Sequence, residues 1–259
     1  AKSAGVVTSC FVAGTLIETI DGLKTIETIK QGDLIWSRHE ETLEYGYRPV
    51  VNTVSYNDKE IYEVVVKDND GKFETYQTTE EHPFWVVDTG WLPVSLLQTG
   101  MTLVNRNDEA VLTVVSQSKL NKTDTVYNFE VAEFHTYHIG EFGVWVHNDC
   151  LPNLNSAKID MNKITGYALD SSHAIGGNKA RVFESALGYN KTNADDLILK
   201  VKQGLKENSA VLGKSDSYGQ RYTVDMPIKG PNGKTVTVRT GWIIDVGQTN
   251  PRLTTIYVK

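Results

Sequence analysis

Two residues near the ends of the first half of the chain could attack the chain's own peptide bonds. Cys10 follows Ser9, and a thiol beside a peptide bond is what an N-to-S acyl shift requires, in which the Ser9–Cys10 amide becomes a thioester. The side-chain nitrogen of Asn148 could attack its own main-chain carbonyl, expel the next residue and leave a C-terminal succinimide. Together they predict one cleavage before Cys10 and one after Asn148.

Hydroxyl and imidazole groups that could assist both reactions stand elsewhere in this half. Thr79 and His82, three residues apart, could polarise and protonate the amide at Cys10. His147 and His135 could supply a donor to the carbonyl oxygen of Asn148 and an acid for the leaving amine. Taken singly, each motif has a commoner explanation: a buried hydrophobic cysteine, a surface turn with an incidental histidine, and an ordinary His-Asn turn.

Short strands must position these groups, because residues 10–148 show no helical period over three turns. Runs rich in β-branched and aromatic residues occur at 61–66, 111–115 and 126–131. Turn-forming clusters at 68–71 and 105–108 separate such runs. The pattern predicts that this half is nearly all β.

The pattern changes after a polar, proline-containing linker at 148–153. Apolar residues recur at helical spacing in two segments, 179–187 and 194–205, the second after a sequence at 192–195 that resembles a capped start. Strand patterns follow at 222–226, 235–239 and 253–258, with a hairpin signal at 230–233. We expect a small α+β domain with two helices on an antiparallel sheet.

Composition separates the two halves by charge. Residues 1–148 carry 11 Lys and Arg against 22 Asp and Glu, a net −11, whereas residues 149–259 carry 15 against 10, a net +5. The basic half is the candidate for a polyanionic partner, although a solvated surface explains the same charge. No apolar run is long enough for a membrane span, and no Cys/His cluster has zinc spacing, so we expect no membrane segment, metal or cofactor. A Cys10–Cys150 disulfide is the alternative to a reactive Cys10.

In this order, the motifs closely resemble the Hint family of inteins, hedgehog autoprocessing domains and bacterial intein-like pretoxin domains. The resemblance covers residues 10–148 and rests on segments 10–17, 22–27, 32–35, 79–83, 126–131, 135–138 and 147–148. It implies a flat, horseshoe-shaped all-β fold with Cys10 and Asn148 side by side at its centre. It also implies autoproteolysis with Cys10, Thr79, His82, His135, His147 and Asn148 as the catalytic residues.

Two positions depart from the family pattern. Splicing needs Cys, Ser or Thr directly after the terminal asparagine, but Asp149 stands there and Cys150 comes one position too late. Separate cleavages are therefore expected in place of splicing. The family often has aspartate where this chain has Asn128, and an amide cannot take up a proton as a carboxylate does. That difference predicts weaker coupling between the two cleavage sites.

A Hint domain ahead of a basic C-terminal domain resembles the arrangement of bacterial polymorphic toxins. The tail resembles an uncharacterised family of small toxin domains through segments 177–184, 187–188, 218–222, 239–242 and 251–255. The expected organisation is an upstream flank at 1–9, a Hint domain at 10–148 and a toxin-like effector at 149–259. The resemblance implies an upstream part of a larger secreted polypeptide, action in the target-cell cytoplasm and a cognate immunity protein.

The residues of the tail favour a metal-independent ribonuclease. The tail holds one histidine and two glutamates, which excludes an HNH-type pair, and it lacks zinc-deaminase ligands. A group to activate the 2′-hydroxyl, an acid and phosphate-binding cations could come from His173, Lys179, Arg181, Arg239, Thr240, Arg252 and Thr255. Alternatives are a DNase, another toxin, or a protein-binding module without catalysis. Lys179 could also be plain helix surface, Arg239 could pair with Asp225, and Trp242 is expected in the core.

Overall fold

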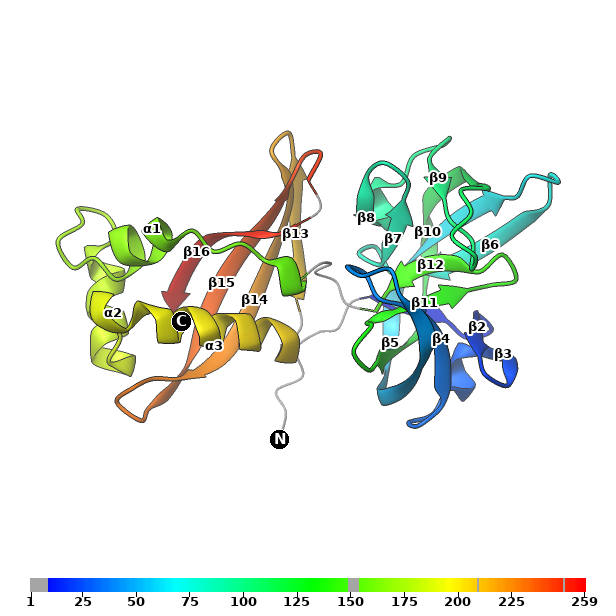
Figure 1. The fold of residues 1–259 in the computed structure, drawn as a ribbon. Helices are drawn as coiled ribbons and strands as arrows, with labels where there is room; N and C mark the ends of the chain where they lie inside the picture. The colour runs from blue at the N-terminus through cyan, green and yellow to red at the C-terminus, as the bar shows by residue number, and fades with distance from the viewer. Residues whose placement is uncertain (1–8, 149–153, 209, 249) are drawn as a thin grey trace. The chain divides into compact units, whose positions relative to one another are not determined.

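The computed structural model describes residues 9–148, 154–208, 210–248 and 250–259. The chain divides into two compact units, one belonging to residues 7–150 and the other to residues 151–259 (Figure 1). Each unit has a sheet of its own. Cys150, Asp149 and the first eight residues lie outside the described residues, so the Cys10–Cys150 alternative falls outside them too.

The first unit is built from twelve strands in one sheet, with two 3-10 turns, Ile26–Thr28 and Val94–Leu96. The strands are β1 Phe11–Val12, β2 Leu16–Thr19, β3 Gly22–Thr25, β4 Leu34–Arg38, β5 Tyr45–Lys67, β6 Phe73–Thr78, β7 Pro83–Val86, β8 Gly90–Pro93, β9 Thr102–Leu103, β10 Leu112–Val131, β11 Thr136–Ile139 and β12 Val144–His147. The all-β prediction for this half is confirmed.

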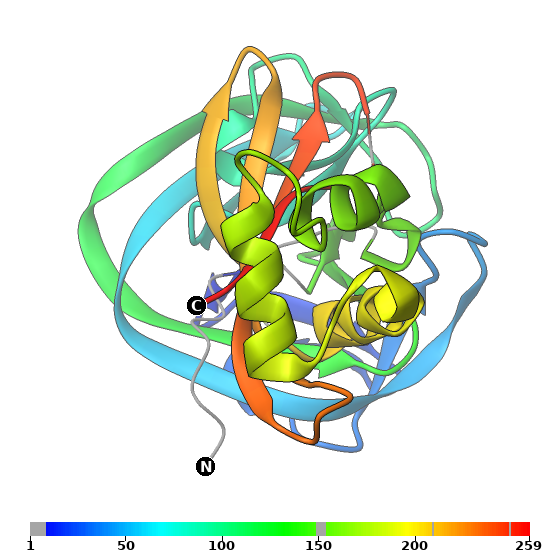
Figure 2. The same cartoon turned by 90° about the vertical axis from the view of Figure 1, so that its left-hand side faces the viewer.

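Strands β5 and β10 form the frame of this unit. They pair antiparallel over most of their length, with shifts of register between Val114 and Ser116 and between Lys119 and Thr123. Figure 2 shows both as long curved ribbons, cyan and green. Bulges of this kind bend and twist a strand pair, which lets two long strands curve and enclose a core. The sequence predicted only short strands because the apolar runs at 61–66 and 126–131 are single parts of these two strands.

The short strands bring the two reactive ends to the same frame. Phe11, next to Cys10, pairs with Tyr127 of β10 on one side and with Thr78 of β6 on the other. Strands β11 and β12 form a hairpin in which Thr136 pairs with His147, and Ile139 of β11 pairs with β2. Both ends of residues 10–148 are thus held in the sheet.

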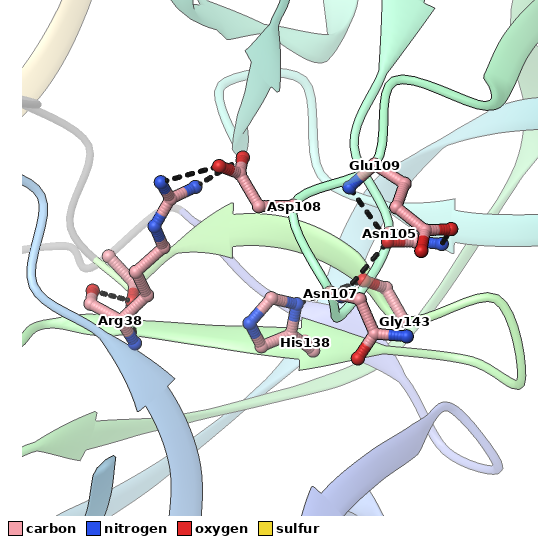
Figure 3. A network of polar contacts seen from close by, with 8 residues as sticks. Arg38, Asn105, Asn107, Asp108, Glu109, His138 and Gly143 are labelled. Atoms are coloured by element: carbon pink, nitrogen blue, oxygen red, sulfur yellow. Dashed lines mark hydrogen bonds and ion pairs between the residues drawn. The ribbon is translucent and has the colours of Figure 1, made fainter. Parts of the chain in front are cut away.

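A partly buried network of polar contacts fixes the β4 end and the β11–β12 hairpin (Figure 3). The Arg38 guanidinium donates to both carboxylate oxygens of Asp108, at 2.6 and 2.9 Å, and lies over the Trp145 ring. His138 lies in the same region, with Nδ1 2.9 Å from the carbonyl oxygen of Gly143. Burial lowers the pKa of His138 to about 4, while the bond to the Gly143 carbonyl opposes this. His138 therefore belongs to the structure as a neutral hydrogen-bonding group.

The second unit has three helical segments and a four-stranded antiparallel sheet in the order β13-β14-β15-β16. Its elements are a 3-10 turn Leu154–Ser156, α1 Met161–Lys163 leading into a π-helical turn Ile164–Ala168, α2 Gly177–Leu187, a 3-10 turn Lys191–Asn193, α3 Ala194–Glu207, β13 Ala210–Asp216, β14 Gly219–Lys229, β15 Thr235–Asp245 and β16 Arg252–Val258. The prediction of two helices and a sheet is confirmed. The sequence missed β13 and the helical segment at 161–168, whose apolar residues form no clear period.

Helices α2 and α3 pack on this sheet, α3 against β14 and α2 against β15 and β16 (Figure 1). The buried residues of each recur every three or four positions, as an apolar stripe requires: Ala180, Phe183 and Leu187 in α2, and Leu197, Val201 and Leu205 in α3. Gly188 ends α2 with a φ of +81°, a left-handed conformation that favours glycine at a helix C-terminus. Trp242 is fully buried, as expected. No helix among the described residues is long and apolar enough to cross a membrane.

Candidate functional site

Cys10 is buried beside the threonine predicted to assist it. Its backbone N–H, which belongs to the Ser9–Cys10 peptide bond, donates to Oγ1 of Thr79 at 3.0 Å. The Cys10 carbonyl accepts from the Thr79 N–H at 3.0 Å and from the Thr78 hydroxyl at 2.6 Å. Ser9 and Cys10 are both fully buried. The nitrogen of the peptide bond before Cys10 is therefore hydrogen-bonded directly to a side-chain hydroxyl.

His82 packs against Phe11, the residue after Cys10, in an apolar environment. Its ring centroid is 4.1 Å from that of Phe11, and the side chain is fully buried. Burial lowers the pKa of His82 well below its ordinary value; the charge of His147 adds to the lowering, and hydrogen bonding to the His147 backbone opposes it. His82 is thus a neutral imidazole near pH 7. The strand after His82 pairs with the strand that ends at His147, through Phe84 and Val146.

Asn148 is held by its main chain. Its N–H donates to the carbonyl oxygen of His135 at 2.9 Å, and its own carbonyl oxygen accepts from Nδ2 of Asn128 at 2.8 Å. The residue is 2 % exposed, and neither side-chain atom, Oδ1 nor Nδ2, has a hydrogen-bond partner among the described residues. A buried amide normally has partners. The side-chain nitrogen of Asn148, the nucleophile in a cyclisation, therefore has no hydrogen-bond partner among the described residues. The carbonyl oxygen of the same residue accepts a hydrogen bond.

Asn128 is oriented by two other contacts. Its Oδ1 accepts from the Phe129 N–H at 2.8 Å and from the Tyr137 hydroxyl at 3.2 Å. Because Oδ1 is occupied by two donors, the NH₂ end of the amide must face the Asn148 carbonyl. Burial raises the pKa of Tyr137 well above its ordinary value, and the charge of Cys10 adds to the rise. The Tyr137 ring also lies edge-on to that of Phe11, 6.3 Å between centroids, so Tyr137 contacts both the residue after Cys10 and the amide that binds Asn148.

His147 forms a buried pair with a glutamate that the sequence did not single out. Its Nε2 lies 2.8 Å from Oε2 of Glu40, and the two side chains are 0 % and 2 % exposed. A carboxylate at this distance fixes the orientation of an imidazole and stabilises its protonated form. The ring of Trp91 stands edge-on to that of His147, 5.1 Å between centroids.

Thr136 holds the segment that carries Glu40. It accepts from the Arg38 N–H at 3.2 Å and donates to the Arg38 carbonyl at 2.5 Å. The Ser37 hydroxyl donates to the Thr136 carbonyl at 2.6 Å. Since Thr136 also pairs with His147 in the hairpin, these bonds tie the end of β4 to the strand that ends at His147. The Arg38–Asp108 pair of Figure 3 anchors the same segment from the other side.

His135 adopts a left-handed backbone conformation, with a φ of +55°. This conformation is uncommon for residues other than glycine and often marks a functional position. It lets the His135 carbonyl accept from Asn148 while its N–H donates to the Val131 carbonyl at 3.3 Å. Its ring is half-buried.

The six residues predicted for this half thus form two groups, one around Cys10 and one around Asn148. Thr79 contacts Cys10 directly, His135 contacts Asn148 through the main chain, and His82 and His147 influence one another electrostatically. Sequence reasoning missed Thr78, Glu40 and Tyr137. It also interpreted Asn128 only as a missing carboxylate, whereas the structure shows it as a donor to the carbonyl of Asn148. The amide within the strand pattern at 126–131 was the available signal.

Four of the tail residues predicted to act on RNA are occupied elsewhere. Arg239 pairs with Asp225 through two bonds of 2.7 and 2.8 Å, as the alternative interpretation expected, and Asp225 also binds Lys259. Arg252 is paired with Asp245 in the same two-bonded way. The Thr240 hydroxyl is buried between the Trp242 indole N–H and the Val224 carbonyl. Arg181 donates to Asn178 on the exposed side of α2.

The other three predicted residues of the tail lie around one tyrosine. Lys179 donates to the Thr255 hydroxyl at 3.2 Å and lies 5.1 Å from the centre of the Tyr167 ring. His173 packs edge-on against Tyr167, 4.8 Å between centroids. Nδ1 of His173 accepts from the N–H groups of Ile175 and Gly176, so in the neutral ring the proton is on Nε2. The predicted cluster is therefore split: His173, Lys179 and Thr255 gather, and the arginines do not join them.

Several solved structures are similar to the first half of the chain. A bacterial intein-like domain from Clostridium thermocellum is 37% identical, with a TM-score of 0.50, and the match covers 54% of this chain and 99% of that domain. The gp41-1 intein matches with 25% identity and a TM-score of 0.44, covering 54% of this chain and 98% of that one. A DnaB intein from Synechocystis matches with 20% identity and a TM-score of 0.46, covering 55% and 99%. The chain matches no curated protein sequence.

Two families divide the sequence between them. Residues 150–259 match a family described as a domain of unknown function, DUF6883. Residues 16–149 match the family described as the pretoxin HINT domain. Intein-like Hint domains process the chains that contain them, which is the activity that the arrangement around Cys10 and Asn148 supports. Through residues 16–149, about half of its length, the chain belongs to the pretoxin HINT family.

Proposed function

We propose that residues 10–148 cut the chain after Asn148 and free residues 149–259. The observation that carries this proposal is the pair of bonds at Asn148, whose main chain is clamped while its side-chain amide has no partner among the described residues. Because the nucleophile and its target carbonyl belong to one restrained residue, the attack is intramolecular. The effective concentration of the nucleophile at the carbonyl is therefore greatly raised.

In the proposed step, Nδ2 of Asn148 attacks the carbonyl carbon of the same residue. A carbon–nitrogen bond forms and the bond from that carbon to the nitrogen of Asp149 breaks. Nδ2 gives up one proton and the leaving amine takes up one, so no net proton is gained or lost. The products are a C-terminal succinimide and a free N-terminus at Asp149. Negative charge develops on the Asn148 carbonyl oxygen, where the Nδ2–H of Asn128 already donates at 2.8 Å.

His147 is the proposed acid for the leaving amine. Its Nε2 is engaged by Glu40, so proton exchange with the reacting peptide falls to Nδ1. Glu40 is then a positioning residue, which keeps the imidazole oriented and favours the protonated form that an acid needs. His135 contributes through its carbonyl, which holds the N–H of Asn148.

At the other end, Sγ of Cys10 attacks the Ser9 carbonyl carbon: a carbon–sulfur bond forms, the Ser9–Cys10 amide bond breaks, and the Cys10 amine takes up the proton that the thiol loses. Thr79 contacts that nitrogen, and His82 packs against the neighbouring Phe11. Splicing would require a nucleophile directly after Asn148 to accept that thioester, and Asp149 does not supply one. The proposed outcome is therefore two separate cleavages.

The direct test of C-terminal cleavage is a time course on purified chain, followed by electrophoresis and N-terminal sequencing. The smaller product should begin at Asp149, and Asn148→Ala should yield none, because alanine has no amide to cyclise. Asn69→Ala, in the exposed turn between β5 and β6, is a matched control and should cut at the normal rate. Continued cleavage at the same bond in the Asn148→Ala chain would refute the mechanism.

We further propose that the chain is part of a larger secreted bacterial toxin and that the freed tail acts inside a target cell, where an immunity protein would oppose it. Ribonuclease activity is the favoured candidate for the tail, supported by the gathering of His173, Lys179 and Thr255 around Tyr167. Incubation of cleaved protein with total RNA and with plasmid DNA separates a ribonuclease from a DNase. A folded tail that cuts neither would favour another toxin or a protein-binding module.

A further inference from the structure

A pocket of about 410 Å³ opens in the second unit between the helical segment at 161–168, the start of α2 and strand β16. Its lining comes from parts of the chain that are far apart in sequence, and most of the lining side chains carry polar groups. The lining residues are Asp160, Asn162, Lys163, Tyr167, Lys179, Thr254 and Thr255. Neither family match nor structural neighbour assigns a role to it.

Lys179 is the central cation of this pocket. Its ammonium donates to Oγ1 of Thr255 at 3.2 Å and lies 5.1 and 5.5 Å from the ring centres of Tyr167 and Tyr257. The side chain is half-buried, and no carboxylate of the described residues forms an ion pair with it. Aromatic rings attract an ammonium but carry no net charge to neutralise it. A partly desolvated positive charge is therefore presented to the pocket.

The arginines of the same unit show the contrast. Arg239 and Arg252 each form a two-bonded pair with an aspartate, so their charges are already neutralised within the fold. Lys179 is on the first turn of α2, where an aspartate would be favourable for the helix, yet the chain places a lysine there. Binding of an external anion therefore explains a lysine at this position better than the charge preference of the helix start does.

The remaining polar groups of the pocket suit an anion as well. Lys163 adds a second positive charge, and Thr254 and Thr255 add hydroxyl groups. Asp160 is the one carboxylate of the lining, and its Oδ1 caps α1 by accepting from the Asn162 N–H at 2.9 Å. Two ammonium groups against one carboxylate leave the lining with a net positive charge. Hydroxyl and ammonium donors at one place are the groups that bind phosphate oxygens.

We propose that this pocket binds a phosphate group of a nucleotide unit, with Lys179 as the main contact and Thr255 orienting it. The proposal deepens the ribonuclease function proposed above by assigning the phosphate contact, and it concerns binding, not cutting. A free nucleotide and an RNA strand share this chemistry, and competition between them decides which is the natural source.

The experiment uses the full chain with Asn148→Ala, so that it stays uncut, and measures fluorescence anisotropy of a fluorescein-labelled single-stranded RNA. Competitors are inorganic phosphate, adenosine 5′-monophosphate and adenosine, the last of which lacks the phosphate and should not compete. Lys179→Gln should weaken RNA binding by roughly tenfold or more, because a charge-assisted hydrogen bond is lost. The dependence of log affinity on log salt should fall by about 0.7, the value of one phosphate contact on a single strand.

Two matched variants complete the design. Lys179→Arg keeps the charge and should bind RNA within a few-fold of the parent, whereas Lys206→Gln removes an exposed charge from α3 and should change little. Circular dichroism checks that each variant folds. As a measurement that needs no substitution, the backbone amide signals of Thr254 and Thr255 should shift in NMR spectra when inorganic phosphate is added.

Each outcome decides the proposal. Equal RNA affinity in the folded Lys179→Gln chain, or unchanged Thr254 and Thr255 signals with every phosphate probe, overturns the phosphate site. RNA cleavage that persists with unaltered binding in Lys179→Gln overturns the site and leaves the ribonuclease standing. Binding that depends on Lys179 without any cleavage supports the site and removes the ribonuclease. If adenosine 5′-monophosphate displaces the labelled RNA at a concentration equal to that of the RNA nucleotides, the natural source of the bound phosphate is a free nucleotide.

Discussion

The side-chain amide of Asn128 donates a 2.8 Å hydrogen bond to the main-chain carbonyl oxygen of Asn148. That oxygen gains negative charge when the asparagine attacks its own carbonyl, so the bond strengthens as the reaction proceeds. The Tyr137 hydroxyl and the Phe129 N–H hold the amide in the donating orientation. An asparagine at this position is therefore a source of stabilisation for the transition state.

Replacing Asn128 by alanine should slow cleavage after Asn148 by about a hundredfold or more, the usual cost of losing one such donor. Asn128→Asp is the sharper variant, because a carboxylate cannot donate unless it is protonated. The ratio of its cleavage rate to that of the parent should rise as pH falls, because protonation restores the donor. Rates are followed by densitometry from pH 5 to pH 8. A rate for Asn128→Ala within twofold of the parent would show that the bond has no catalytic part.

Glu40→Gln should slow the same cleavage by roughly tenfold to a hundredfold, a fraction of what general acid catalysis contributes. Loss of the carboxylate removes the group that stabilises protonated His147, so the pH–rate profile should also move to lower pH. Glu44→Gln, an exposed neighbour, is the control and should leave rate and profile unchanged. A slower rate with an unshifted profile would mean that Glu40 supports only the fold.

Added thiol should release residues 1–9 by attack on the thioester at Cys10, and Cys10→Ala should abolish that release. Cys150→Ser separates the two thiols of the chain and should release the fragment normally. Mass spectrometry should find no product that joins residues 1–9 to residues 149–259, because Asp149 cannot accept the acyl group. Detection of that joined product would establish splicing and overturn the interpretation of Asp149.

Acid should destabilise the first unit through its buried histidines. His138 has a pKa of about 4 when folded, against an ordinary 6.5, so the unfolded chain binds more protons between these values. Stability is complete above pH 6.5 and is lost as pH falls toward 4. From pH 7 to pH 5 the loss from this residue is about 2 kcal/mol. The lowered pKa of His82 acts in the same direction.

Urea denaturation of the Asn148→Ala chain, followed by tryptophan fluorescence, measures this effect, since four of the five tryptophans lie in residues 10–148. His138→Gln should keep a donor for the Gly143 carbonyl and remove most of the pH dependence due to this residue. The free energy of unfolding at pH 7 minus that at pH 5 should therefore be smaller in the variant. An unchanged difference would place the acid sensitivity elsewhere.

The sequence predicted the chemistry of the first unit better than its tertiary contacts. Cys10, Thr79, His82 and Asn148 could be chosen because their types and order match one reaction. Glu40 could not, because a glutamate in a polar turn looks like solvated surface until the strand pairing of Thr136 with His147 buries it. Nothing in the sequence singled out Tyr137, because its hydroxyl contact with Asn128 exists only in the folded chain.

In the second unit, the strand and helix periods predicted the elements, and the pairing of Arg239 with Asp225 could be anticipated from their adjacent strands. The grouping of cations could not be predicted, because charge alone does not say which lysine or arginine meets a carboxylate. The fold neutralises Arg239 and Arg252 and leaves Lys179 beside two tyrosine rings. That difference depends on contacts between residues up to about eighty positions apart.

The chemical identity of the new C-terminus at residue 148 tests the proposed asparagine cyclisation most directly. Accurate mass measurement of the larger fragment distinguishes a succinimide from ordinary hydrolysis, because the cyclised end is lighter by one water. We predict a freshly cut fragment that ends in the succinimide at Asn148, with a partner fragment that starts at Asp149. A fragment that carries the mass of the free acid from the earliest time point, with no succinimide before it, would contradict cleavage by asparagine cyclisation.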